Sequence, residues 1–233
     1  MTTPVISVVV PGPTELAEAA ASWTAEHITG AVSARRACYL ALAGGETPRG
    51  CYERLAQAPY GESLPWASVF VYWSDERQVP LDDPASNYAM AKAALLDHVP
   101  IPPEQVFPLV GDPTPALRRV PADASGRPRF DVIHLGLGDD GHTASLFPGS
   151  PALHEAQALV AVVHDAPKPP PERLTLTLPV INAARAVLFM VKGASKRDAL
   201  ARVRRRDPAV PASHVLPVDG ELRFIVDRAA MGE

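Results

Sequence analysis

The 233-residue sequence contains no apolar run that approaches the roughly 20 residues needed for a membrane-spanning helix. Its first residues, MTTPVISVVVPGP, place no positive charge before a short apolar stretch, so they do not resemble a signal peptide. Only two cysteines occur, Cys38 and Cys51, which favours two buried thiols over a disulfide. The net charge of −4 argues against a general nucleic-acid-binding surface, which is usually basic. We therefore expect a soluble, cytoplasmic protein with neither a membrane nor a nucleic acid as its partner.

Lysine is also scarce: only Lys92, Lys168, Lys192 and Lys196 are present, whereas arginine is common. This bias is most simply a property of the genome, and it makes any lysine near a candidate site more informative. The sequence lacks both the motif of a serine nucleophile and the motifs of a metal site. No G-x-S-x-G elbow surrounds a serine, and no histidine pair has the HExxH or Cys/His spacing of a metal site. The sequence therefore predicts neither a serine nucleophile nor a bound metal.

Apolar strand-like runs alternate with helical patterns along the whole chain. This alternation predicts a mostly parallel sheet with helices on both faces. Thr14 is predicted to cap the first helix, and Thr47 with Pro48 to open the second. The predicted strands are residues 6–10, 37–43, 69–74, 130–137, 159–164, 174–178, 186–191 and 222–226, and the helices are 14–36, 47–58, 87–99 and 195–206. No repeat or long linker divides the chain, so we expect one domain spanning residues 1–233.

The most informative segment is FDVIHLGLGDDGHTASLFPG, residues 130–149. A buried strand there runs into a glycine-rich loop that carries Asp139, Asp140 and His142, at the sheet edge where α/β proteins bind ligands. The loop matches G-x-G-x-x-G, but its two acids would repel a pyrophosphate, so we reject a dinucleotide site. We expect a helix to start at Thr143, with its dipole keeping His142 neutral and able to act as a general base.

The segment LALAGGETPRG, residues 40–50, places Gly44 and Gly45 between a strand and a helix start. Such a turn exposes backbone N–H groups and forms an anion site. The alternative is a tight turn that needs glycine only for its backbone conformation. The segment alone does not separate the two, and Glu46 counts against phosphate unless its side chain points away.

Three further segments carry charged residues near a predicted strand. Asp75 and Arg77 follow a buried strand, either at the ligand-binding edge or in a solvated turn. Arg173 opens a strand behind a stiff proline loop, where a fixed guanidinium could meet phosphate, or else Glu172 in a surface salt bridge. Lys196 lies in a first helical turn, where a cation is unfavourable unless an anion is nearby.

Together, GGETP, SDER, GLGDDGHTASLFPG, KPP…RLTLT and VKGASK resemble the 6-phosphogluconolactonase family. The blocks occur in the family's order from about residue 5 to the C-terminus. The resemblance implies a single-domain, Rossmann-like fold of the deaminase/isomerase type. It also implies hydrolysis of 6-phosphoglucono-δ-lactone to 6-phosphogluconate in the pentose phosphate pathway, with a phosphorylated sugar lactone as ligand. No metal or organic cofactor is implied, and we expect a monomer or weak homodimer.

The same resemblance carries the family's functional residues onto this sequence. It implies that His142 is the general base and that Asp140 orients its ring. Asp75 and Arg77 match the family's DER positions, and we assign Arg77 to substrate or oxyanion binding. The residues that match the sugar- and phosphate-binding positions are Gly44, Gly45, Thr47, Arg173 and Lys196. The chain departs from the family at Glu46, where a serine or another small residue is usual.

Two rival functions remain. Glucosamine-6-phosphate deaminases resemble DGHIAFNEPG in this block, with a carboxylate five residues after the histidine. Here that position is Phe147, which cannot shuttle protons, and this favours the lactonase. The other rival is a sugar-phosphate-binding regulator that has lost catalysis. That reading predicts a missing histidine or acid, yet both His142 and Asp140 are present, and the chain has no room for a DNA-binding domain.

Overall fold

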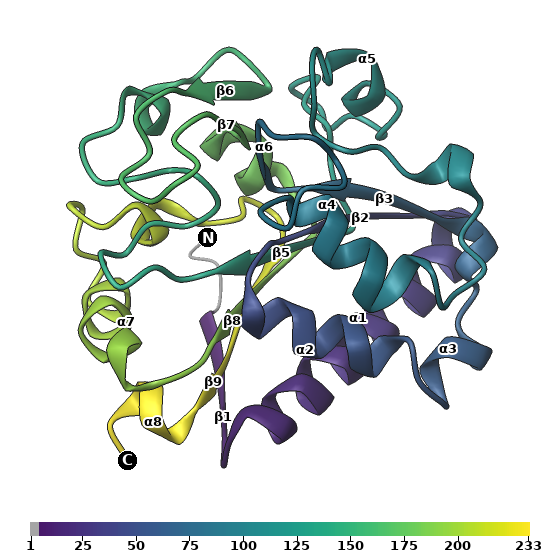
Figure 1. The fold of residues 1–233 in the computed structure, drawn as a ribbon, viewed down its shortest axis with the longest axis horizontal. Coiled ribbons are helices and arrows are strands. Elements are labelled where there is room, and N and C mark those ends of the chain that lie inside the picture. The colour runs from purple at the N-terminus through teal and green to yellow at the C-terminus, as the bar shows by residue number, and fades with distance from the viewer. Residues whose placement is uncertain (1–4) are drawn as a thin grey trace.

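The computed structural model describes residues 5–233, and a six-stranded sheet forms its centre (Figure 1). Neighbouring strands all run parallel. In spatial order they are β1 (Val5–Val10), β9 (Glu221–Asp227), β8 (Ala186–Val191), β5 (Val132–Gly136), β2 (Cys38–Leu42) and β3 (Val69–Trp73). Every residue of β8 is buried, which explains its continuous apolar sequence.

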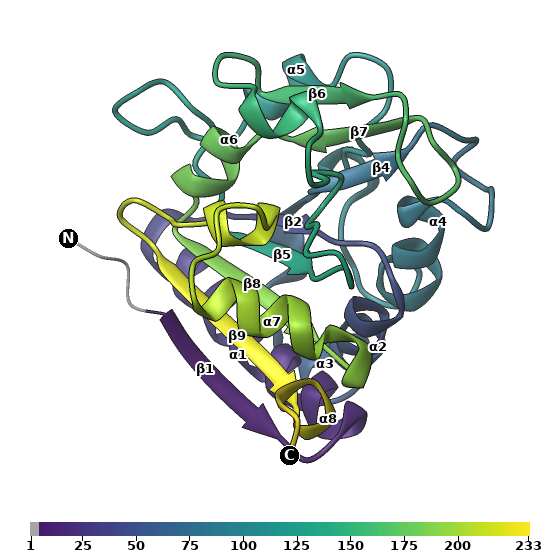
Figure 2. The same ribbon diagram turned by 90° about the vertical axis from the view of Figure 1, so that its left-hand side faces the viewer.

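Helices cover both faces of this sheet. The long helices α1 (Pro13–Arg35) and α2 (Glu46–Leu55) lie on one face, and α7 (Arg197–Arg204) and α8 (Arg228–Met231) lie on the other (Figures 1 and 2). The predicted α/β class, a mostly parallel sheet with helices on both faces, is therefore confirmed. The shorter helices are α3 (Tyr60–Ser63), α4 (Asn87–Ala91), α5 (Thr114–Leu117) and α6 (Leu178–Ala183).

A second, antiparallel sheet lies at the top of Figure 2, on the far side of the molecule from β1, and its first strand follows directly after β3. Its order is β4 (Asp75–Arg77), β7 (Arg173–Leu176) and β6 (Val160–Val163). The sequence predicted β6 and β7 within the main sheet and Asp75–Arg77 only as a strand end, so this sheet is a correction. The chain changes sheets at Ser74, whose N–H donates to Leu42 of β2 while its carbonyl accepts from Leu176 of β7.

Both predicted helix caps are wrong. The N-cap of α1 is Gly12, with Pro13 at the first helical position, so Thr14 lies inside the helix. The N-cap of α2 is Gly45, and Thr47 lies in the first turn after Glu46. Gly45 has φ +102°, a conformation that residues with a side chain rarely adopt. Backbone shape therefore starts this helix, without a side-chain cap.

The strand order places a topological switch point between β2 and β5. The chain leaves β2 through α2 toward β3, whereas from β5 it continues toward β8 on the other side. The two loops that follow β2 and β5 diverge, and in open α/β sheets such a point opens the ligand crevice. The sheet topology alone therefore locates a site beside the segments that carry Gly44 and His142.

Cys38 and Cys51 are both free and buried, as predicted. In the described part of the chain, no helix is long and apolar enough to cross a membrane.

Candidate active site

A cleft of about 470 Å³ opens at the carboxyl edge of the parallel sheet. Its walls come from the segments that follow β2, β3, β5 and β8, and from the start of β7. Most of the predicted site residues line it, namely Gly44, Gly45, Thr47, Asp75, Arg77, His142, Arg173 and Lys196. The proline loop at residues 166–171 borders it through Lys168 and Pro169, as expected.

Basic side chains dominate the charge of the cleft. They are Arg77, Lys168, Arg173, Lys192 and Lys196, whereas the acids of the lining are Glu46 and Asp75. The whole chain carries a net charge of −4, so this positive charge is local. A basic cleft on an acidic protein favours an anionic small molecule.

The loop that carries His142 is closed by its own backbone. The N–H of Gly138 donates to the His142 carbonyl at 2.8 Å, and the N–H of Gly141 donates to the Gly138 carbonyl at 3.0 Å. Gly141 has φ +85°, and a Cβ added to Gly138 would lie 2.0 Å from Nδ1 of His142. The glycines therefore let the imidazole ring lie directly over the backbone. In a dinucleotide-binding loop, by contrast, the glycines make room for a phosphate group.

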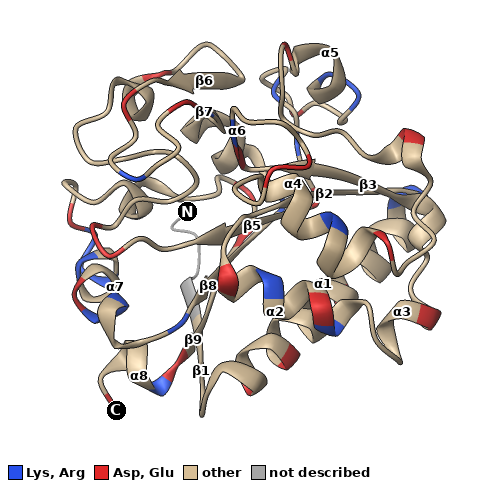
Figure 3. Ribbon diagram, in the orientation of Figure 1, with Lys and Arg blue, Asp and Glu red and all other residues tan. Residues whose placement is uncertain are grey.

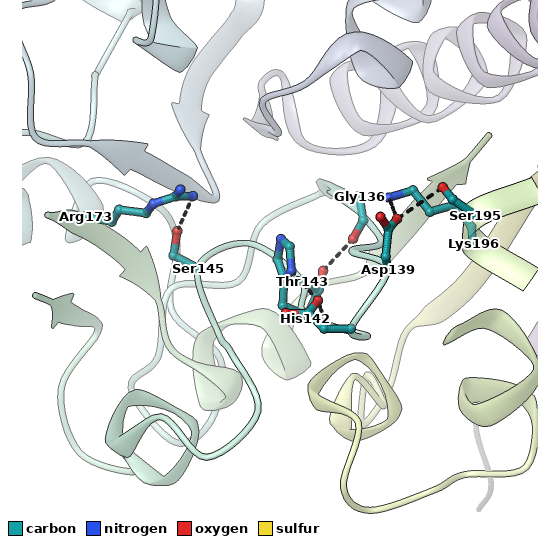
Figure 4. Close-up of polar contacts among 9 residues, drawn as sticks. Gly136, Asp139, His142, Thr143, Ser145, Arg173, Ser195 and Lys196 are labelled. Atoms are coloured by element: carbon teal, nitrogen blue, oxygen red, sulfur yellow. Dashed lines mark hydrogen bonds and ion pairs between the residues drawn. The ribbon is translucent and has the colours of Figure 1, made fainter. Parts of the chain in front are cut away.

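The predicted helix at Thr143 does not form. Residues 143–146 make a tight turn in which Leu146 N–H donates to the Thr143 carbonyl at 2.9 Å, and Ala144 has φ +48°. The Thr143 hydroxyl donates back to the Gly136 carbonyl at 2.9 Å (Figure 4). A helix dipole therefore cannot be what keeps His142 neutral.

Burial keeps His142 neutral instead. The side chain is only 16% exposed, and the Phe147 ring lies 4.5 Å from the imidazole, centroid to centroid. Burial lowers the pKa of His142, and the nearby Asp140 carboxylate opposes this shift only in part. Burial raises the pKa of Asp140, but hydrogen bonds from His142 outweigh it and leave that pKa below its ordinary value.

Asp140 orients the ring through one hydrogen bond. Nδ1 of His142 donates to Oδ1 of Asp140 at 2.6 Å, and the same oxygen accepts the backbone N–H of His142 at 3.1 Å. This bond sets the tautomer, so Nε2 carries no proton and is free to accept one. Asp75 makes no hydrogen bond to the imidazole within residues 5–233, and its carboxylate is engaged elsewhere. Asp140 is therefore the acid in direct contact with the histidine.

Asp75 belongs to a buried polar network on one side of the cleft. Its Oδ2 accepts the Ser145 hydroxyl at 2.7 Å, and its Oδ1 accepts an amide N–H of Asn87 at 3.3 Å. Arg173 is 4% exposed and reaches the same Ser145 hydroxyl at 3.5 Å (Figure 4). Burial lowers the pKa of Arg173, and the Asp75 carboxylate opposes the shift. This network holds the Arg173 guanidinium at the cleft wall through contacts with Ser145 and, beyond it, Asp75.

The turn after β2 supplies the opposite wall. A Cβ at Gly44 would lie 1.8 Å from Oδ1 of Asn87, so only glycine fits there. The Glu46 side chain is 79% exposed, and its carboxylate lies 3.8 Å from the Arg49 guanidinium on the outer surface of α2. Although Glu46 lines the cleft, its carboxylate is largely solvated and lies near the Arg49 cation, so its charge beside this turn is screened.

Lys196 and Arg173 lie on opposite sides of His142 (Figure 4). Lys196 donates to the Asp139 carboxylate, which also accepts the Ser195 hydroxyl at 3.2 Å. Arg77 donates to the Ala85 carbonyl at 2.7 Å, while its Nε is buried without a hydrogen-bond partner in the described chain. The histidine therefore has cationic groups on both sides.

Residues 11–224 match the family model of glucosamine-6-phosphate isomerases/6-phosphogluconolactonase. The chain belongs to this family. A 6-phosphogluconolactonase of Synechocystis sp. is 41% identical over 217 residues, which cover 88% of each chain. One from Mycobacterium leprae is 37% identical over 228 residues, covering 91% of this chain and 92% of the relative. The solved 6-phosphogluconolactonase of Trypanosoma brucei has a TM-score of 0.86 at 29% identity, and 99% of each chain is covered.

Three hydrogen-bond-donating side chains that line this cleft were not among the predicted site residues: Asn87, Lys168 and Lys192. The rarity of lysine was a signal for two of them, because three of the four lysines in the chain line this cleft. Asn87 gave no such signal, since its contacts with Gly44 and Asp75 exist only in the folded chain. Among residues 5–233, no group of three or more His, Cys, Asp or Glu side chains is arranged to hold a metal ion.

Proposed function

We propose that this protein hydrolyses 6-phospho-D-glucono-1,5-lactone to 6-phospho-D-gluconate, the lactone-opening step of the oxidative pentose phosphate pathway. One observation carries the proposal: His142 is held by Asp140 with Nε2 free, and Phe147 lies against the ring at the position where a deaminase has a carboxylate. An apolar ring there cannot relay protons between the carbons of an open-chain sugar. The relatives named 6-phosphogluconolactonase support the same choice.

In the proposed reaction, Nε2 of His142 takes a proton from a water molecule as its oxygen attacks the lactone carbonyl carbon. The carbonyl electron pair moves to oxygen and returns when the ring C–O bond breaks. The departing ring oxygen then takes the proton from His142, and the product acid ionises. A lactone is an activated ester, so a positioned water suffices and no covalent nucleophile is needed. The Ser145 hydroxyl is fully buried and donates to Asp75, which agrees with its exclusion as a nucleophile.

The basic cleft would bind the phosphate and so orient the lactone over the histidine. The groups proposed for sugar and phosphate binding are the turn of Gly44, Gly45 and Thr47 together with Arg173 and Lys196, all of which line the cleft. Asp75 and Arg77 would contact substrate from the second sheet. We propose that residues 1–233 act as one catalytic domain, as a monomer or weak homodimer.

The test is turnover of freshly generated 6-phosphogluconolactone, followed by acid release and corrected for spontaneous hydrolysis. His142→Ala should abolish the enzymatic rate while circular dichroism and the melting temperature stay close to wild type. His98→Ala is the matched control, because His98 is an exposed histidine away from the cleft. Near-wild-type turnover by His142→Ala contradicts the assignment. Release of ammonia from glucosamine 6-phosphate at a comparable rate would favour the deaminase instead.

A further inference from the structure

Lys168 lies on a loop that the protein fixes to the wall of the cleft. The ends of the loop are joined by the Ala166 N–H, which donates to the Pro171 carbonyl at 3.2 Å. The buried Arg173 donates from Nη2 to the Lys168 carbonyl at 2.6 Å and from Nε to the Pro170 carbonyl at 3.0 Å. The backbone of Lys168 is thus held by a side chain of the second sheet, and the residue lines the cleft.

The Lys168 ammonium makes no contact with another described side chain, and among the five cleft cations it shares this property with Lys192. Within residues 5–233 the Lys168 ammonium makes no hydrogen bond and no ion pair, so its three N–H donors remain available. Lys196 is paired with Asp139, and the Arg173 guanidinium is tied to the two main-chain carbonyls of the loop. Arg77 is anchored on the Ala85 carbonyl. Lys168 can therefore turn toward a ligand group in the cleft without breaking a contact, and of the two unpaired lysines it is the one whose charge acts on the pKa of His142.

The charge of Lys168 also acts on the pKa of His142. Burial is the main cause of the lowered pKa of His142, and the Lys168 charge lowers it further, while Asp140 and Asp75 act in the opposite direction. The hydrogen bond from Lys196 is the main cause of the lowered pKa of Asp139, and the Lys168 charge adds to it. Lys168 and His142 line the same cleft, so this effect of the charge agrees with where the structure places the two residues.

We propose that Lys168 stabilises the oxyanion of lactone hydrolysis, by donating a hydrogen bond from its ammonium to the carbonyl oxygen as water attacks. The water that loses its proton to Nε2 of His142 must lie within about 3 Å of the carbonyl carbon, so the carbonyl oxygen also lies beside the histidine. Lys168 keeps its proton throughout: the water proton goes to His142 and then to the ring oxygen, while the electron pair moves onto the carbonyl oxygen and back. This inference rests on the proposed function.

The same location gives Lys168 a second effect. Its positive charge disfavours a proton on His142, so it holds the base in its active form as pH falls. An ammonium that only bound the phosphate at the far end of the sugar would change KM and leave the titration of His142 unmoved. The two effects of Lys168, on the oxyanion and on the base, therefore distinguish it from a simple phosphate ligand.

The experiment compares Lys168→Met and Lys168→Arg with wild type over a range of pH. We expect Lys168→Met to lower kcat about 100-fold, the usual cost of removing one oxyanion donor, with KM changed by less than about threefold, as expected for an interaction made mainly in the transition state. The acid limb of kcat/KM should move to higher pH, because removing a nearby cation raises the pKa of His142. Lys168→Arg should keep the wild-type acid limb and recover part of kcat. Lys92→Met is the control and should match wild type, because Lys92 is exposed and paired with Asp97.

Three outcomes overturn the inference: a kcat of Lys168→Met within threefold of wild type, an acid limb that does not move, or a loss confined to KM. The Lys168 side chain is exposed, and Arg173 contacts only the main-chain carbonyl of Lys168. Substituting the side chain therefore leaves the fold in place. The failure of the proposed function looks different. In that case the wild-type protein itself would not hydrolyse the lactone, and His142→Ala would change nothing.

Discussion

Gly138→Ala is the sharpest test of how the loop builds the site. The added methyl group would lie 2.0 Å from Nδ1 and 2.3 Å from Cε1 of His142, and 2.5 Å from Oδ1 of Asp140. Ordinary contact begins at 3.4 Å, so the imidazole must move by more than an ångström and the carboxylate by nearly as much. The methyl thus enters the space of the hydrogen bond that sets the tautomer of His142.

The expected cost falls on catalysis more than on the fold. Misplacing a reacting group by 1 Å costs roughly 100-fold in rate, and losing general-base catalysis altogether costs up to about 10⁴-fold. We therefore expect kcat/KM to fall between those limits, which corresponds to about 3 to 5.5 kcal/mol of transition-state stabilisation. The free energy of unfolding should fall by at most about 1 to 3 kcal/mol, the usual range for overpacking. Gly138 has no positive φ, so alanine adds no backbone strain.

The assay is lactone hydrolysis with urea unfolding measured in parallel. Gly30→Ala is the matched control, because Gly30 lies on the exposed surface of α1 and nothing lies within 4 Å of an added Cβ. It should keep full activity and gain up to about 1 kcal/mol in stability. Wild-type activity in Gly138→Ala would refute the reasoning that the histidine must lie over this glycine.

Three further results follow from the same site. Wild-type kcat/KM should fall at acid pH with a midpoint below pH 6.5, because His142 must be neutral to act and burial lowers its pKa from 6.5. Asp140→Asn removes a carboxylate that raises the pKa of His142, so this midpoint should move to still lower pH and kcat should fall. A move to higher pH would contradict the contact between Asp140 and His142. Arg173→Ala should chiefly raise KM for the phosphorylated lactone, and an unchanged KM would remove Arg173 from the phosphate site. Burial raises the pKa of Cys38 and of Cys51, the latter to about 12. A thiol reagent should therefore label these cysteines only when the protein unfolds, and rapid labelling of the native protein would contradict this.

Local sequence was enough to predict the histidine and its acid. Asp140 and His142 are two residues apart, and Gly138 before them and Gly141 between them allow one tight loop, so their contact depends on little beyond the loop itself. The alternation of apolar runs and helical patterns was likewise enough for the parallel sheet. Strands that are buried on both faces must be continuously apolar, and that pattern is visible in the residues of β8.

The helix predicted at Thr143 shows where local signals fail. Thr143 is a good capping residue in isolation, but in the structure its hydroxyl donates a hydrogen bond to the Gly136 carbonyl. The residues that follow do not continue into a helical turn, because the Ser145 hydroxyl donates a hydrogen bond to Asp75 and the Ser145 N–H donates one to the Thr175 hydroxyl. Those partners lie at least 30 residues away in sequence, so the competition cannot be judged from the segment alone.

What the sequence determined by itself was the class of fold, the edge of the sheet that carries the site, and the pair of His142 and Asp140. Tertiary structure decided the second sheet, in which the β4 residues Asp75–Arg77 pair with β7 almost one hundred residues later, and with it the wall that holds Arg173 and Lys168. The reason is physical. Periodicity and turn chemistry act over a few residues, whereas strand pairing, burial and the convergence of charges depend on which distant surfaces the folded chain brings together (Figure 3).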